Sequence, residues 1–344
     1  MSRASRARRV VTAAAFGTGG IGALSAVAAG LIYGQTKLAR RRIQPPEAHP
    51  PRADGVWLAP GVPADGPLLL LAMIGDSSAA GYGVHRDSET PAAQIALGLS
   101  ALARRPVRLR NVAVVGAQSS ALASQVALVL PERPDLVVIM IGANDVTHRI
   151  RPSESVRHLT DALSTLAEHN LPVVVGTCPD LGTIRPISQP LRWLARRMSR
   201  TLAASQAVAV VAAGGRAVSL GDILGPEFAS SRDYFSEDQF HPSAIGYARA
   251  AEVLLPSAAA ALGLSTVSEQ AAPFTSKRAR PVAKAAAKAA GLPGTEVLPA
   301  EVRGERSGRH GPWARLLRRR ATTVIPPTSG GQENFTPATM VDSD

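Results

Sequence analysis

The strongest constraint on the fold is an unbroken apolar run, Leu68 to Ile74, that ends in Gly75-Asp76-Ser77. Such a run, bounded by turn residues, is typical of a strand buried on both faces of a parallel sheet. Ligands of these sheets bind outside the carboxyl ends of the strands. Ser77 therefore lies where a reactive side chain would meet a ligand, beside free N–H groups that open the next helix. A serine after a strand is more commonly a turn residue or an N-cap, so the assignment needs support from elsewhere in the chain.

From Leu68 onward, segments typical of strands alternate with segments typical of helices. Strands are expected at 68–74, 107–114, 135–141, 171–177 and 207–213, and helices at about 89–103, 119–130, 153–169, 186–205 and 243–262. This alternation predicts βαβ units with right-handed crossovers. The expected fold class is therefore α/β, a three-layer α/β/α sandwich around a parallel sheet.

Three further sequence blocks follow Ser77 in order. They are Asn111-Val-Ala-Val-Val-Gly116, Gly142-Ala-Asn144-Asp145 and Asp238-Gln-Phe-His241-Pro242. Together with Gly75-Asp76-Ser77 they resemble the four blocks of the SGNH (GDSL-type) hydrolases, over about residues 66–262. The resemblance implies a flavodoxin-like sheet of five parallel strands and an esterase or lipase-like activity. In overall plan the chain is similar to exported or membrane-anchored GDSL-type esterases of actinobacteria and mycobacteria.

The candidate catalytic residues are Ser77, Asp238 and His241. A serine hydroxyl is a poor nucleophile until an adjacent base can take its proton. His241 is the best candidate base, because Asp238 three residues earlier can orient the imidazole within one turn and stabilise the imidazolium. Glu237 is the nearest rival carboxylate, and the resemblance places the acid at Asp238.

Acyl transfer also requires donors for the negative oxygen of its tetrahedral intermediate. The candidate oxyanion hole comprises the N–H groups of Ser77 and Gly116 and the side-chain amide of Asn144. Alternatively, Gly116 is only a turn residue and Asn144 is only a helix cap. The match of both to the family blocks favours the oxyanion hole. No metal and no organic cofactor is implied. The single cysteine, Cys178, excludes an internal disulfide and a Cys-based zinc site.

The net charge of +12 is concentrated at the two ends of the chain. Residues 1–42 hold eight basic and no acidic side chains, or +8, and residues 265–344 hold twelve basic and seven acidic ones, or +5. Residues 43–264, with 18 basic and 19 acidic side chains, have a net charge of −1. The expected hydrolase domain, residues 67–264, is therefore not a basic nucleic-acid reader.

The segments outside that domain have different compositions. Residues 1–42 contain an uncharged run from Val10 to Gly34 that is long enough to cross a bilayer. A signal-anchor helix, a cleaved signal peptide and a soluble helix are all compatible with it, and a membrane anchor or signal peptide is the expectation. The enzyme would then lie at the cell membrane or be exported to the cell envelope. Residues 43–66, with six prolines, predict an extended tether, and residues 265–344 predict a disordered basic tail.

The segment from Pro179 to Arg200 should border the site, because it follows the fourth expected strand. Its apolar side chains either line an acyl pocket or pack the following helix, and its arginines either attract an acidic group or form a solvated helix face. The apolar residues are Ile184, Ile187, Leu191 and Trp193, and the arginines are Arg185, Arg192, Arg196, Arg197 and Arg200. No large inserted lid is visible, which favours small and accessible esters.

The expected function is a serine esterase that hydrolyses short to medium acyl esters through an acyl-enzyme. O-deacetylation of a cell-envelope glycan and a non-catalytic envelope scaffold are the alternatives. The expected partners are a small ester and, through the N-terminal segment, a membrane. The sequence leaves the oligomeric state open.

Overall fold

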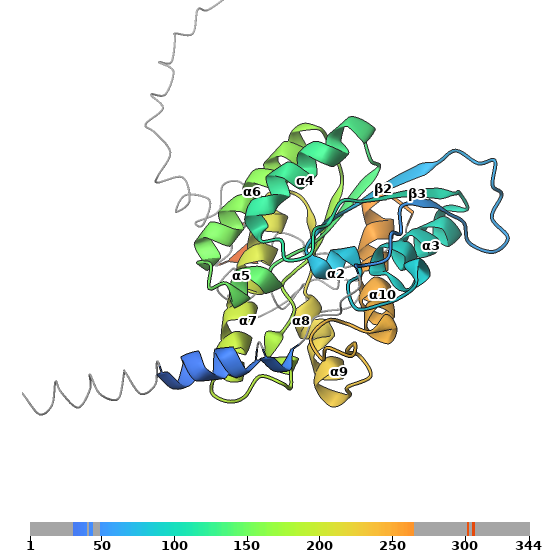
Figure 1. The fold of residues 1–344 in the computed structure, drawn as a ribbon. Coiled ribbons are helices and arrows are strands. Elements are labelled where there is room, and N and C mark those ends of the chain that lie inside the picture. Colours follow the sequence, from blue (N-terminus) through green and yellow to red (C-terminus); the bar gives the residue numbers. More distant parts are fainter. Residues whose placement is uncertain (1–29, 40, 44–48, 265–300, 303–304, 307–344) are drawn as a thin grey trace, which may run out of the picture.

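The computed structural model describes residues 30–39, 41–43, 49–264, 301–302 and 305–306. Its centre is a six-stranded sheet in the order β1-β3-β2-β4-β5-β6 (Figure 1). The strands are β1 (Gly55–Trp57), β2 (Leu69–Gly75), β3 (Val107–Asn111), β4 (Leu136–Met140), β5 (Val173–Gly176) and β6 (Arg216–Val218). Strands β2 to β6 are parallel, and β1 is antiparallel to β3 at the edge. Counted along the chain, the parallel strands lie in the flavodoxin-like order 2-1-3-4-5, so the predicted fold class is confirmed.

Helices cover both faces of this sheet (Figure 1). They are α2 (Ser77–Ala80), α3 (Pro91–Ala103), α4 (Leu122–Val129), α5 (Ala143–Thr147), α6 (Pro152–Glu168), α7 (Leu191–Ala212), α8 (Leu220–Ile223), α9 (Gly225–Ser230) and α10 (Ala244–Ala261). Helices α3 and α10 pack on one face, and α4, α6 and α7 pack on the other.

Successive residues of β2 point into opposite layers. Leu71 and Met73 pack with α3 and α10, whereas Ala72 and Ile74 pack with α4, α6 and α7. Every residue of β4 is buried as well. Burial on both faces is the reason that these strands are continuous apolar runs rather than alternating ones.

The prediction of a fifth strand at 207–213 is wrong. These residues continue α7 to Ala212, and the fifth parallel strand is the shorter β6. Hydrophobic periodicity does not separate a short buried helix segment from a buried strand, and this Ala/Val-rich run fits both. In the structure Ala207 and Val210, three residues apart, face the sheet together, and the chain leaves the helix through Gly214 at φ +83°.

The prediction of residues 43–66 as an extended tether needs a correction, because β1 belongs to the sheet. Gly55–Trp57 contains no proline, so its backbone can pair with β3. Asp54 Oδ1 accepts the Asn111 N–H at 2.6 Å, and Ala53 and Ala59 are buried. Residues 49–66 are therefore attached to the hydrolase domain, while residues 44–48 lie outside the described part of the chain.

Residues 30–39 form a helical segment that lies beside the lower end of α7 (Figure 1). Gln35 joins the two, because its Nε2 donates to Gln189 O at 2.5 Å and its Oε1 accepts the Leu191 N–H at 3.1 Å. Ala39 is buried in the same contact region. This helical segment therefore packs on the domain.

Within the described residues, none of the helices combines the length and apolar character that crossing a bilayer requires. Most of the predicted apolar segment, residues 10–29, lies outside the described residues. So does most of the predicted tail, of which the structure describes two short strands. These are β7 (Glu301–Val302) and β8 (Glu305–Arg306), which pair antiparallel.

Candidate active site

Ser77 lies at the sharp turn between β2 and α2. Gly75 makes the turn possible with φ +140°, since a Cβ there would come within 1.9 Å of the Met140 carbonyl oxygen. Asp76 caps α2, and its Oδ1 accepts the Ser78 N–H at 2.9 Å. Ser77 is the first residue of the helix, so its own N–H has no acceptor inside α2.

Gln125 of α4 fixes this turn from below. Its Oε1 accepts the Gly75 N–H at 2.6 Å, and its Nε2 donates to Gly75 O at 2.9 Å. The side chain is buried, and both of its polar atoms are satisfied by one glycine. Sequence reasoning missed Gln125. The available signal was a lone amide on the buried face of α4, beside Leu122, Val126 and Val129.

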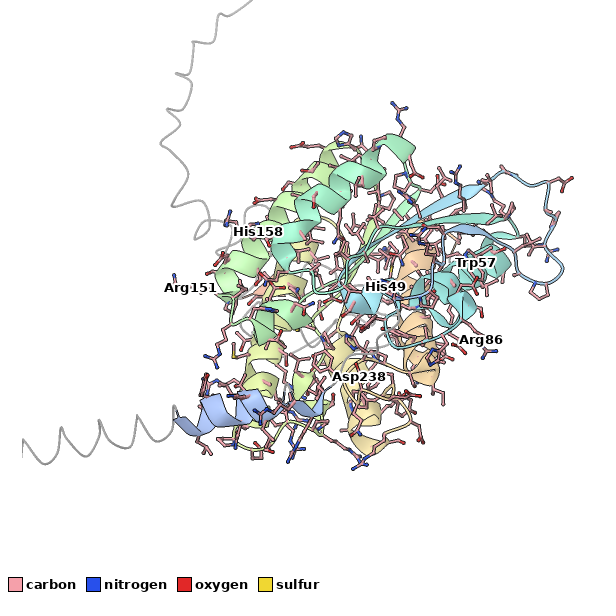
Figure 2. All side chains as sticks on the ribbon, viewed as in Figure 1. His49, Trp57, Arg86, Arg151, His158 and Asp238 are labelled. Carbon is pink, nitrogen blue, oxygen red and sulfur yellow. The ribbon has the colours of Figure 1, made fainter. Side chains whose placement is uncertain are left out.

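The structure brings the three candidate catalytic side chains into one hydrogen-bonded series. His241 Nε2 lies 3.0 Å from Ser77 Oγ, and His241 Nδ1 lies 2.6 Å from Asp238 Oδ2. Asp238, labelled in Figure 2, also accepts the N–H groups of Phe240 and His241. Burial raises the pKa of Asp238, but hydrogen bonds from His241 and Ser236 outweigh it and lower that pKa below its usual range. The carboxylate therefore stays ionised and orients the ring with Nε2 toward Ser77.

Two aromatic rings hold the imidazole in place. Tyr82 and Phe240 each meet His241 edge to face, with ring centroids 4.8 and 4.9 Å away. Tyr247 of α10 is fully buried, and its hydroxyl donates to Tyr82 O at 2.7 Å. Sequence reasoning missed both tyrosines, because they come from segments far from each other in the chain.

Gly116 and Asn144 follow β3 and β4, at the same edge of the sheet as Ser77. Gly116 has φ +83° in the exposed loop after β3, and its N–H has no hydrogen-bond partner among the described residues. Asn144 Nδ2 donates to Ala117 O at 3.0 Å, which ties α5 to the Gly116 loop. An amide has two N–H bonds, so one remains for a ligand. In the described part of the chain, neither residue hydrogen-bonds to Ser77 or His241.

Asp145 holds this loop arrangement from the buried side. It accepts hydrogen bonds from Ser119 Oγ at 3.0 Å and from Ser155 Oγ at 2.9 Å. These contacts join the loop after β3 to α6, as expected of a residue that positions its loop.

Comparison with known proteins decides the family. The model of the GDSL-like Lipase/Acylhydrolase family matches residues 73–249, about half of the chain. This matched range contains Ser77, Gly116, Asn144, Asp238 and His241. The chain belongs to this family. It is a carboxylic ester hydrolase.

A curated relative of this GDSL-like hydrolase is the GDSL-like esterase Rv1075c of Mycobacterium tuberculosis (strain ATCC 25618 / H37Rv). The two are 43% identical over 236 residues, which cover 65% of this chain and 74% of the relative. Among solved structures, TesA has 21% identity and a TM-score of 0.46, covering 57% of this chain and 99% of TesA. A catalytic variant of Axe2, an acetylxylan esterase from Geobacillus stearothermophilus, has 18% identity and a TM-score of 0.44, with coverages of 59% and 97%.

A mostly apolar cavity of the GDSL-like hydrolase lies beside Ser77, with a free space of about 80 Å³. Its wall includes the carboxyl ends of β4 and β5, the 3-10 turn η4 (Leu181–Thr183), α8 and α9. The main apolar lining residues are Leu181, Ile184, Leu224, Phe228, Phe235 and Phe240. Of the apolar side chains between Pro179 and Arg200 that were open to two interpretations, Ile184 lines this cavity. Ile187 and Leu191, the first residue of α7, belong to an apolar cluster with Leu202, and Trp193 is exposed.

Asp76 is the one carboxyl of the hydrolase site whose pKa is strongly raised. Complete burial raises it from 3.8 to about 6, against the lowering effect of the Ser78 N–H. Because the folded protein holds this proton more tightly than the unfolded chain, its stability should fall as the pH rises through the interval between those values. The resulting loss in the free energy of unfolding is complete above about pH 6 and amounts to about 3 kcal/mol.

Asp76→Asn should remove this dependence, because an amide keeps an oxygen acceptor for the Ser78 N–H but does not ionise. Denaturant unfolding of both proteins between about pH 4.5 and 7.5 measures the difference. The stability of the wild type relative to the variant should fall with rising pH. Parallel profiles would show that Asp76 does not titrate in this range.

Proposed function

We propose that this hydrolase cleaves short to medium acyl esters through an acyl-enzyme on Ser77. His241 acts as the base and then as the acid, and Asp238 orients it. The N–H groups of Ser77 and Gly116 and the amide of Asn144 hold the oxyanion. The supporting observation is the series of contacts from Asp238 through His241 to Ser77 Oγ, beside an apolar cavity.

The reaction takes place in two halves. In the first, His241 Nε2 takes the hydroxyl proton while Ser77 Oγ bonds to the ester carbonyl carbon. The negative oxygen of the resulting tetrahedral intermediate accepts hydrogen bonds from the oxyanion-hole donors. When this intermediate collapses, the bond to the alcohol oxygen breaks, and Nε2 returns the proton to the leaving alcohol. In the second half, His241 Nε2 takes a proton from the water that attacks the acyl carbon. The bond from that carbon to Ser77 Oγ then breaks, Nε2 returns the proton to Oγ, and the carboxylic acid leaves.

The cavity sets the expected acyl preference. About 80 Å³ of free space, lined in part by Phe228, Phe235 and Phe240, suits a short chain better than a long one. A panel of p-nitrophenyl esters with acyl chains of increasing length tests this. We expect kcat/KM to be highest for short and medium chains and to decline for long ones. A protein that hydrolyses none of the panel would favour the scaffold alternative.

Asn144→Ala should lower kcat about 10²–10³-fold, because one oxyanion donor is usually worth that much. KM for a p-nitrophenyl ester should change little, since the donor acts mainly on the charge that develops in the intermediate. Thr147→Ala, on the same short helix and exposed, is the matched control and should retain activity. Equal activities of the two variants would remove Asn144 from the oxyanion hole.

The N-terminal segment is proposed to attach the enzyme to a membrane, at the cell membrane or in the cell envelope. Support comes from the uncharged run between Val10 and Gly34 and from the arginines that precede it.

Deletion of residues 1–29 tests this attachment and spares the helical segment that Gln35 joins to α7. The full chain should sediment with membranes in high salt, whereas the shortened chain should stay in solution with unchanged activity on p-nitrophenyl acetate. A full chain that salt releases from membranes would contradict an inserted anchor.

A further inference from the structure

A second cavity, of about 230 Å³, lies next to the Ser77 cavity and has a different chemistry. Its polar lining includes three arginines, together with Gln189, Thr183 and the exposed Trp193. The arginines are Arg185, Arg192 and Arg196. None of the described residues that line it carries a carboxylate. We name this space the arginine pocket.

Two of these guanidinium groups are held in fixed positions. Arg185 donates to the carbonyl oxygens of Ala229 and Ser230 in α9, at 2.9 and 3.1 Å. Arg196 pairs with the buried Asp180 at 3.3 Å and lies over Gly182, where a Cβ would come within 2.4 Å of its Nε. Their geometry is therefore set before any ligand arrives, which lowers the entropy cost of binding.

The described acidic residues do not neutralise the positive charge of the pocket. Among the described residues, Arg185 hydrogen-bonds only to neutral carbonyl oxygens, and Arg196 shares the single carboxylate of Asp180 with Arg200. Arg192 is half-buried, and its guanidinium has no hydrogen-bond or ion-pair partner in the described part of the chain. The nearby carboxylate Glu227 in α9 is already paired with Arg249 at 2.9 Å. Guanidinium groups in this state bind carboxylate or phosphate with paired, charge-assisted hydrogen bonds.

The arginine pocket and the Ser77 cavity share a wall. Thr183 lines both, and the turn η4 separates them. Helix α9 contributes Phe228 to the Ser77 cavity and the next residue, Ala229, to the arginine pocket. The cavity beside Ser77 and the cationic pocket therefore adjoin at Thr183.

We propose that the arginine pocket binds an acidic group of the substrate, so that the preferred substrate is an ester that carries a carboxylate or phosphate. This inference rests on the proposed function, because it extends the substrate that Ser77 attacks. Arg192 is then a residue that determines specificity. Its role is to bind the acidic group, and it takes no part in the proton transfers.

Matched esters test the proposal in the full-length protein. The mono-p-nitrophenyl esters of succinate and adipate carry a terminal carboxylate, and p-nitrophenyl butyrate and hexanoate are their neutral counterparts. We expect at least one acidic ester to have a lower KM than its neutral counterpart. Arg192→Gln should raise the KM of that acidic ester about tenfold and leave kcat, and both constants for the neutral ester, within about twofold. Arg157→Gln, an exposed arginine on α6, is the control for loss of charge and should have no effect.

Equal effects of Arg192→Gln and Arg157→Gln on the acidic ester would overturn the proposal. A calorimetric titration with pyrophosphate tests the pocket without any turnover. Pyrophosphate binding that is lost in Arg192→Gln supports the anion site, even if the protein cleaves no ester. Failure to cleave any ester would refute the proposed function and not the anion site. Unchanged pyrophosphate binding in Arg192→Gln would refute the anion site. If Arg192→Gln loses only its binding to phosphatidylglycerol vesicles, the pocket faces an anionic membrane and the substrate proposal is wrong.

Discussion

Ser77→Ala is expected to lower kcat for p-nitrophenyl acetate by about 10⁴–10⁶, with the fold unchanged. The hydroxyl is 3.0 Å from His241 Nε2, and its loss leaves the base with no proton to take and the ester with no nucleophile. Alanine adds no atoms in the narrow turn after β2, so the thermal unfolding temperature should remain close to that of the wild type. Steady-state hydrolysis and circular dichroism provide the two measurements.

Ser78→Ala is the matched control. Ser78 also lines the cavity, and both its backbone N–H and its hydroxyl hydrogen-bond to Asp76. Alanine retains the backbone N–H, which has the larger effect on Asp76. This variant should therefore keep most of its activity. If Ser78→Ala were inactive and Ser77→Ala active, the nucleophile would be assigned to the wrong serine.

Asp238→Asn is expected to lower kcat by about 10⁴, the loss found when an amide replaces the orienting carboxylate of a triad. Asp238 Oδ2 lies 2.6 Å from His241 Nδ1, and its lowered pKa keeps it ionised at neutral pH. An amide that donates toward Nδ1 would favour the tautomer with its proton on Nε2, and that tautomer does not accept the serine proton.

Glu237→Gln is the control for this carboxylate. Glu237 is adjacent in sequence but exposed, and in the described part of the chain it makes no hydrogen bond or ion pair with His241. Its variant should keep nearly full activity in the same assay. Loss of activity in Glu237→Gln, with activity kept in Asp238→Asn, would mean that the acid was assigned to the wrong residue.

The sequence predicted the parts of the fold in which one local signal has one interpretation. The apolar run before Gly75 is bounded by turn residues, which favours a buried strand, and Gly75 itself is required because β4 passes so close. The alternation of elements then predicts that the strands are parallel, and the family resemblance supplies the flavodoxin-like arrangement. Residues 207–213 were misassigned because an Ala/Val-rich segment fits the periodicity of a helix as well as that of a strand. Packing on the sheet, which the sequence does not show, selects the helix.

The candidate site divides in a similar way. Ser77, Asp238 and His241 were predicted because each lies in a short block, and the separation of Asp238 from His241 already favours their contact. Tyr82 and Gln125 act through contacts between segments distant in sequence, and no local pattern shows such contacts. The sequence raised the possibility that the arginines after the fourth strand bind an acidic group. Only the positions of α7 and α9 show which of these arginines share a pocket.

Labelling with a fluorophosphonate probe, followed by peptide mapping, tests the central claim most directly. Such a probe reacts only with a serine whose hydroxyl is activated by a neighbouring base. We expect a single modified serine, Ser77, and no modification in Ser77→Ala or His241→Ala. A label on another serine, or labelling that persists in Ser77→Ala, would contradict the assignment of Ser77 as the nucleophile.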